Sequence, residues 1–259
     1  MQTAADGSLD KAVTLAAATA PLRIGVVFCG RQNPAGHNII SGLLEFIQTN
    51  CPAGSVLLGF LRGTKGMFAG QAVKLSKSDL SLFVNQGGFD MLGRSSEQIH
   101  TDEQLIASLA TCQKLSLDGL VLIGGRHTLT DTATLAEYFV AEEAATRVVA
   151  VPTSMERDIR HPLVETTIGF DTATRVLASL IANIATDARS AKKYWWFIRL
   201  PGRDTSHVTL ECAAQTRPNV ILLSEEVAKR GMNLRGVVQY LADVVCRRAV
   251  SGNIASKTL

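Results

Sequence analysis

The sequence Gly-Gly-Arg-His-Thr at residues 124–128 is suited to binding a phosphate group. They directly follow an apolar run that is typical of a buried strand. Gly124 and Gly125 let the backbone turn with its N–H groups open to an anion. Arg126 and His127 would either face that anion or be solvated loop residues. Neither can serve as a hard-cation ligand, because Mg²⁺ prefers oxygen donors.

Residues 152–158, Pro-Thr-Ser-Met-Glu-Arg-Asp, follow the next apolar run and supply two carboxylates. Glu156 in such a place can deprotonate a substrate hydroxyl, and Asp158 can hold Mg²⁺ indirectly. The alternative is a solvated turn in which the carboxylates pair with Arg157. The two segments together indicate phosphoryl transfer, but the first is basic where a metal–phosphate site needs carboxylates.

Three more polar segments follow apolar runs in the same way. Gly30 permits a sharp turn before a helix N-terminus, without the Gly-Lys-Ser/Thr of a Walker loop, and it also fits an ordinary turn. Gly202 and Arg203 form another such segment, in which the guanidinium can clamp a phosphate with two hydrogen bonds. Glu226 can accept a hydrogen bond from a sugar hydroxyl. Each of these residues alone is also consistent with an unremarkable surface position.

The composition indicates a folded protein and argues against several classes of function. The 259 residues are 46% hydrophobic and 19% charged, with a formal net charge of +3. That charge does not indicate nucleic acid or a membrane surface, although it is compatible with an anionic ligand. The five cysteines lack Cys-x-x-Cys spacing, which favours buried thiols in a reducing, cytoplasmic setting. We expect no membrane span and no targeting peptide.

Strand-like apolar runs and helical periodicity alternate from Pro21 onward. Residues 1–20 are expected to form a tail, and the glycine-rich stretch 61–94 a functional loop. The alternation predicts an α/β fold with doubly wound parallel sheets, in which ligands bind at the carboxyl ends of the strands. The expected strands are residues 23–28, 55–60, 118–123, 146–151, 195–200 and 219–223, and the expected helices are 37–49, 101–115, 131–143, 171–188, 207–215 and 234–250.

A series of stretches in this order resembles the phosphofructokinase superfamily, most closely its pyrophosphate-dependent branch. The resemblance covers residues 21–248. The Phe-Cys-Gly-Arg-Gln and Asp-Met-Leu-Gly-Arg versions look like the regulatory α subunit of the plant-type enzyme, or the equivalent half of a fused protist form. The stretches are residues 25–32, 36–38, 85–94, 117–125, 169–172, 190–194, 197–200 and 206–208.

The resemblance implies two lobes and a reaction. The lobes would be a phosphoryl-donor-binding lobe over residues 21–162 and a partial sugar-phosphate lobe over residues 163–259. Catalytic members transfer a phosphoryl group from pyrophosphate to the 1-hydroxyl of fructose 6-phosphate with Mg²⁺. Because the family continues beyond the position of Leu259, we expect this chain to be part of a longer polypeptide or a fragment.

The family's Gly-Gly-Asp-Asp-Ser motif falls on residues 124–128. In the family the first aspartate binds Mg²⁺ and the second is associated with a preference for pyrophosphate. Here Arg126 and His127 replace both aspartates, and Thr128 replaces the serine. The local charge is therefore reversed, and Mg²⁺ would meet repulsion where it needs ligands.

The family's Pro-Lys-Thr-Ile-Asp-Gly-Asp motif falls on residues 152–158. The lysine becomes Thr153, the catalytic base becomes Glu156, and the last aspartate is kept as Asp158. Glu156 is one methylene longer than the family's base, and a misplacement of about 1 Å can cost a hundredfold in rate. The family's Met-Gly-Arg and its sugar-binding glutamate correspond to residues 201–203 and Glu226.

These departures predict a regulatory, non-catalytic subunit that keeps a sugar-phosphate or effector pocket. Its expected partners are a catalytic β-type subunit or fused half in a hetero- or homo-oligomer, and its expected ligands are fructose 6-phosphate or fructose 2,6-bisphosphate. Mg²⁺ belongs to the family but is not expected to bind residues 124–128. Two alternatives stay open: an active phosphotransferase with Glu156 as base, and a scaffold that binds only its partner.

Overall fold

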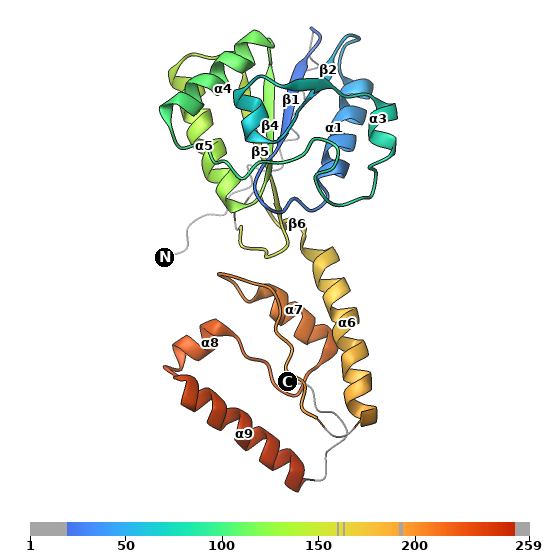
Figure 1. Cartoon of the computed structure of the whole chain (residues 1–259), viewed down its shortest axis with the longest axis vertical. Helices are drawn as coiled ribbons and strands as arrows, with labels where there is room; N and C mark the ends of the chain where they lie inside the picture. The colour runs from blue at the N-terminus through green and yellow to red at the C-terminus, as the bar shows by residue number, and fades with distance from the viewer. Residues whose placement is uncertain (1–19, 160, 163, 192–193, 252–259) are drawn as a thin grey trace, which may run out of the picture.

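The structure, a computed structural model, describes residues 20–159, 161–162, 164–191 and 194–251. The predicted tail lies outside these residues except for Ala20. The chain forms two parts along its long axis (Figure 1). One part is a sheet with helices on both sides, and the other consists of helices joined to the first through α6 (Phe170–Ala191).

A six-stranded sheet with the order β3-β2-β1-β4-β5-β6 forms the first part. All neighbouring strands are parallel except β2 and β3, which are antiparallel. The predicted α/β fold is confirmed, with one antiparallel edge strand in the stretch expected to be a loop. The strands are β1 (Arg23–Phe28), β2 (Val56–Phe60), β3 (Ala72–Lys74), β4 (Gly119–Gly124), β5 (Arg147–Ser154) and β6 (Ile168–Gly169).

Side chains alternate between the two faces of the sheet, and each face has its own buried cluster. Val27 of β1 packs with Leu109 and Leu135 on one face, whereas Val26 packs with Ile40 on the other. The doubly wound arrangement follows, because helices must cover both faces to bury these apolar runs. The helices on this part are α1 (Gly36–Asn50), α2 (Thr64–Phe68), α3 (Lys77–Ser81), α4 (Asp102–Lys114) and α5 (Arg126–Ala141).

The second part is built from helices and has a smaller core. Its buried cluster consists of Phe170, Ile181, Val208 and Cys212. These residues bring α6 against α7, while the last helix of this part has no buried residue. Besides α6, the helices are α7 (His207–Thr216), α8 (Ser224–Lys229) and α9 (Leu234–Val250).

Two predicted strands of the second part are absent from the described residues. Residues 195–200 contain only an isolated bridge at Trp196, and residues 219–223 have no regular secondary structure. Both stretches have strand-like composition, but a strand persists only when neighbouring strands take up its hydrogen bonds. Here they lie beside a cavity and no sheet pairs them.

Two further boundaries differ from the expected ones near the strand ends. β5 does not stop at Pro152 but runs on to Ser154, with Pro152 paired in register with Gly124. α5 begins at Arg126, five residues before the expected start. Residues 126–128 therefore form the first turn of a helix, which gives them a fixed direction that a loop would not.

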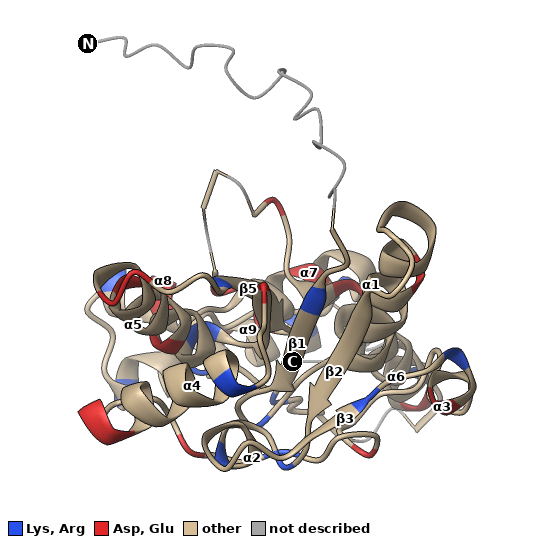
Figure 2. Cartoon of the chain, turned by 90° about the horizontal axis from the view of Figure 1, so that it is seen from above, with Lys and Arg blue, Asp and Glu red and all other residues tan. Residues whose placement is uncertain are grey.

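In Figure 2, which shows the chain from above, the positions of basic and acidic residues are interspersed along the ribbon. This distribution agrees with the small net charge of the chain. Among the described residues, no helix combines the length and the apolar character needed to cross a membrane.

Candidate functional site

The carboxyl ends of β1 and β4 meet closely at Gly124. The amide of Cys29 donates to the carbonyl of Ile123 at 2.9 Å, which holds the two strand ends together. A Cβ on Gly124 would lie 2.9 Å from both the Cys29 carbonyl oxygen and the Thr128 Cβ. Only glycine fits there without moving the backbone, and the contact brings the first turn of α5 against the end of β1. Gly30, with φ of 79°, makes the turn that follows β1.

The first turn of α5 presents a positive end to this edge of the sheet. Gly125 is the N-cap residue and provides no side-chain hydrogen bond to the turn, which contains no acidic residue. Arg126 and His127 are exposed, whereas Thr128 is buried. Free N–H groups and the helix dipole add to the charge of the guanidinium. This arrangement favours an anion.

Arg126 forms an ion pair with Asp204, which comes from the connection between α6 and α7. The two side chains are 51% and 49% exposed. The pair joins the start of α5 in the first part of the molecule to a loop of the second part. Asp204 was missed by sequence reasoning, because the contact spans 78 positions of the chain.

Asp131 lies one helical turn after His127 and is buried. Burial raises the pKa of the Asp131 carboxyl above its usual range, and a hydrogen bond from the Ile99 backbone and the nearby His100 and His127 oppose this rise. Sequence reasoning placed Asp131 only at a helix start. Its spacing of four from His127 was the available signal, since residues i and i+4 share a helix face.

The end of β5 is tied down by side-chain hydrogen bonds. Thr153 is buried and donates to Asn33 Oδ1 at 3.0 Å, where the family resemblance expects a lysine. Ser154 Oγ donates to Asp158 Oδ1 at 2.7 Å and accepts from the Glu156 amide at 3.2 Å. These bonds fold residues 154–158 into a compact turn with both carboxylates half-buried.

These elements surround one cavity of about 610 Å³. It contains most of the predicted site residues, and Gly124 packs immediately behind it. Its wall contains four arginines and five carboxylic side chains, so neither sign dominates. The predicted residues in the wall are Gly30, Gly125, Arg126, His127, Thr128, Glu156, Asp158 and Arg203, and the charged residues not predicted are Arg31, Arg94, Glu97, Asp131 and Asp204.

Arg94 reaches this cavity from the glycine-rich stretch 61–94. Its Nη1 donates to the carbonyl of Arg31 at 3.1 Å, and its guanidinium lies 5.2 Å from the centre of the Phe89 ring. The stretch was expected to be functional, and the structure places its last residue beside the turn that follows β1. The residue itself was not identified as a site residue from the sequence.

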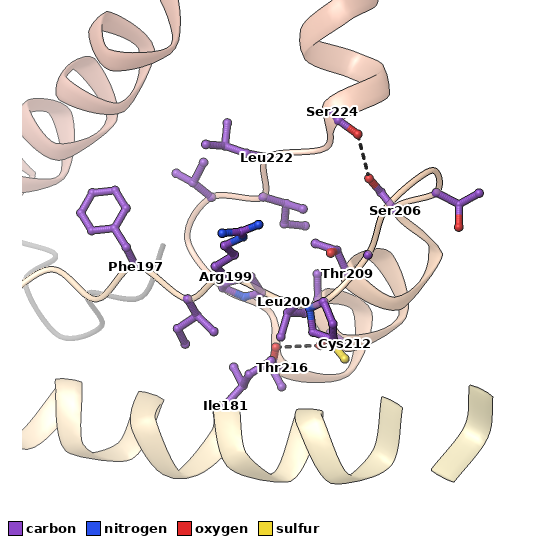
Figure 3. Close-up of a pocket in the computed structure, with 18 of the residues that line it drawn as sticks. Ile181, Phe197, Arg199, Leu200, Ser206, Thr209, Cys212, Thr216, Leu222 and Ser224 are labelled. Atoms are coloured by element: carbon purple, nitrogen blue, oxygen red, sulfur yellow. Dashed lines mark hydrogen bonds between the residues drawn. The ribbon is translucent and has the colours of Figure 1, made fainter. Parts of the chain in front are cut away.

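A second cavity of about 480 Å³ lies in the helical part (Figure 3). Gly202 and Arg203 line it, and Arg203 thus borders both cavities. Figure 3 shows Arg199 extending into this space, with Leu222 and Thr209 around it. Its wall mixes apolar side chains of α6 and α7 with hydroxyl groups, a combination that suits an organic anion.

Glu226 does not join either cavity. It lies exposed on α8 and contacts Arg230, with Oε2 and Nη2 3.4 Å apart. The neighbouring Glu225 instead accepts from the amide and the hydroxyl of Ser206, at 2.9 and 2.6 Å. The Ser206 hydroxyl and the backbone amides lower the pKa of Glu225 to about 2.

The residues at the start of α5 do not fit a Mg²⁺ ion. The nearest side chains there are a guanidinium and an imidazole, and Asp204 is engaged by the guanidinium. Asp158 accepts from Ser154, and burial favours the protonated form of Asp131. A hard dication needs oxygen ligands, and the first turn of α5 itself contains no acidic residue.

Comparison with known proteins places this geometry in context. The phosphofructokinase family model matches residues 23–252. The α subunit of pyrophosphate–fructose 6-phosphate 1-phosphotransferase from Solanum tuberosum is 47% identical over 88% of this chain and 37% of its own length. The β subunit from the same plant is 46% identical over 89% of this chain and 40% of its own length. The chain thus spans well under half of these relatives.

A solved structure supports the fold. Pichia pastoris phosphofructokinase in the T-state superposes with a TM-score of 0.76 at 17% sequence identity, over 92% of this chain and 24% of that chain. At this identity the likeness concerns the fold alone.

Proposed function

The chain belongs to the phosphofructokinase family, and we propose that it is a regulatory, non-catalytic subunit of a pyrophosphate-dependent 6-phosphofructokinase, or part of one. In this role it supports the phosphorylation of fructose 6-phosphate to fructose 1,6-bisphosphate in glycolysis. A catalytic β-type partner or a fused half performs the phosphoryl transfer and binds Mg²⁺. The names of its relatives, which include both α and β subunits, motivate this partnership.

The observation that carries the proposal is the ion pair of Arg126 with Asp204 at the start of α5. The resemblance expects a Mg²⁺-binding carboxylate at position 126. A guanidinium at this position repels a dication, and here it forms an ion pair with the Asp204 carboxylate of the same chain. Position 126 therefore carries a positive charge where the family has a negative one. The nearby carboxylate of Asp204 is paired with this guanidinium.

The environment of Thr153 supports the same conclusion. The resemblance expects a lysine at this position, whereas the threonine is buried and bonded to Asn33. A lysine offers a mobile positive charge to a transferred phosphoryl group, but a buried hydroxyl that donates to an amide does not. Relative to the family motifs, the site has lost the lysine at position 153 and both aspartates at positions 126 and 127.

Ligand binding is retained in this proposal, with Arg203 and Arg199 as the phosphate-binding residues. Both line the cavity of about 480 Å³, which lies within the range of about 300–1,000 Å³ typical of small-molecule sites. Arginine binds a phosphate with two parallel hydrogen bonds. We assign fructose 6-phosphate or fructose 2,6-bisphosphate to this cavity.

The test is calorimetry with both sugar phosphates together with a turnover assay on the purified chain. We expect saturable binding that is lost in Arg203→Ala and no turnover with fructose 6-phosphate, Mg²⁺ and either pyrophosphate or ATP. Arg235→Ala on α9, outside both cavities, is the matched control and should bind as the wild type does. Turnover by the chain alone contradicts the proposal, and absence of binding favours a scaffold without ligand.

An active phosphotransferase is the second candidate, because Glu156 lines the same cavity as Arg203 and the start of α5. A carboxylate among these groups is in a position to act as a base. This candidate requires turnover that Glu156→Gln abolishes in a preparation free of other subunits. If there is no turnover to abolish, the candidate fails.

A further inference from the structure

Three consecutive residues, Asp204, Thr205 and Ser206, each bind a different element around the cavities. Asp204 pairs with Arg126 at the start of α5. Thr205 Oγ1 donates to the carbonyl of Glu156 at 3.1 Å. Ser206 donates twice to Glu225 on α8, as described above. We call residues 202–206 the strap, since this loop of the second part contacts the first part through Arg126 and Glu156.

The attachments of the strap at Ser206 and at Asp204 differ in strength. Ser206 is held by two short hydrogen bonds to an ionised carboxylate, which are stronger than neutral ones. Asp204 is held by an ion pair that is about half exposed, and such pairs are weak and weakened further by salt. The contact of Asp204 with Arg126 is therefore the attachment of the strap that can release.

The Asp204 carboxylate lies where an external anion would bind. It pairs with the one guanidinium in the first turn of α5, and both side chains line the cavity of about 610 Å³. An oxyanion that enters this cavity meets the same guanidinium and the same helix N-terminus. Asp204 and such an anion compete for Arg126.

We propose that Asp204 is an internal competitor for an oxyanion such as inorganic pyrophosphate or phosphate, and that binding of this anion to Arg126 releases the strap. The proposal rests on the proposed function only for the identification of this cavity as a phosphate site. The ion pair of Arg126 with Asp204 is thus an autoinhibitory contact within the chain. It could not form with an aspartate at position 126, because two carboxylates would repel each other.

Release of the strap would also change the position of a residue that lines the second cavity. Arg203 precedes Asp204 directly and borders both cavities. A shift of Asp204 away from α5 also moves the backbone of Arg203 and therefore its guanidinium. Oxyanion binding at Arg126 and sugar-phosphate binding at Arg203 are then coupled, and the coupling is reciprocal.

The experiment is calorimetric titration of the whole chain with inorganic pyrophosphate, without Mg²⁺ and at low ionic strength. Asp204→Asn should bind about two- to fivefold more tightly than the wild type, because a half-exposed ion pair no longer competes. Arg126→Ala should lose the binding. Asp243→Asn is the matched control, because this exposed aspartate on α9 accepts a hydrogen bond from Gln239 through its side chain and lies outside both cavities. It should bind as the wild type does.

A second measurement reports on the strap itself. Hydrogen exchange of residues 202–206 should become faster when pyrophosphate is added to the wild type, and should already be fast in Asp204→Asn. Equal affinity of wild type and Asp204→Asn, undiminished binding by Arg126→Ala, or absence of pyrophosphate binding in all folded variants would overturn the proposal. These outcomes differ from failure of the proposed function, which would appear as turnover by the isolated chain.

Discussion

Arg126, Glu156 and Asp131 face one cavity from three different environments, and their charges decide what it accepts. The guanidinium is half exposed and paired, Glu156 is half-buried, and Asp131 is buried. An anion is favoured near Arg126, whereas burial favours the neutral form of Asp131. At the scale of single residues, the site is better suited to binding a phosphate group than to binding Mg²⁺.

The burial of Asp131 leads to a pH-dependent stability. Its native pKa is raised above the ordinary value of about 3.9. The native state therefore holds a proton more tightly than the unfolded state. The stabilisation this provides is complete below about pH 4 and is lost as pH rises through the native pKa.

Asp131→Asn should remove this loss while keeping an acceptor for the Ile99 backbone. Urea unfolding at pH 4, 5.5 and 7 should show that the wild type loses more stability across this range than the variant, by at most about 1.4 kcal/mol per pH unit. Parallel stability curves for the two proteins would show that Asp131 is not perturbed in the native state.

At the scale of residues, most of the site residues predicted from the sequence lie in the wall of the larger cavity. They follow strands, and the carboxyl ends of parallel strands meet at one edge of a sheet. Asp204 and Asp131 were missed because their roles come from a long-range contact and from burial, which local sequence does not reveal. The sugar-binding role of Glu226 stays a prediction, and the structure places this residue on α8 in contact with Arg230.

At the scale of elements, the junction between β4 and α5 positions the whole phosphate edge. Gly124 closes β4, and the next residue caps a helix whose first turn faces the cavity. The close approach of Thr128 and the Cys29 carbonyl to Gly124 leaves no room for a side chain. The glycine is thus a packing requirement as well as a turn residue.

Gly124→Ala should destabilise the chain by about 1–3 kcal/mol, because the added methyl group overpacks a buried junction. Gly87→Ala is the control, since a Cβ there would meet no atom within 4 Å. Urea unfolding of both variants measures the difference. A Gly124→Ala chain as stable as the control would mean that the junction yields easily.

Elements with strong local signals were predicted well. The helix over residues 234–250 has the expected bounds, and the capping box at Thr101 is formed with Gln104. The strands expected at 195–200 and 219–223 failed, because strand formation depends on a neighbour and not on composition alone. The early start of α5 was missed because a helix can begin directly after a glycine N-cap.

At the scale of the whole molecule, the two parts differ in how much apolar surface they bury. The sheet carries two large buried clusters, whereas the helical part has one cluster of four buried residues. Several large apolar side chains of the second part remain exposed, among them Phe197 at 70% and Leu234 at 80%. The second part is therefore expected to be the less stable one.

Native-state hydrogen exchange should show this difference directly. We expect amides of α9, which has no buried residue, to exchange fastest among the long helices, and amides of β1 and β4 to exchange slowest. The free energies of opening follow from exchange rates at several urea concentrations. Equal protection of α9 and β1 would contradict the unequal burial described above.

The regulatory role is tested most directly by titrating the chain into a catalytic β-type subunit and following the initial rate with fructose 6-phosphate, pyrophosphate and Mg²⁺. We expect no turnover by the chain alone, a saturable change in the rate or in the fructose 6-phosphate dependence of the β-type subunit, and the same change with Glu156→Gln. Turnover by the chain alone that Glu156→Gln abolishes would contradict it, as would a β-type subunit that responds to no concentration of the chain.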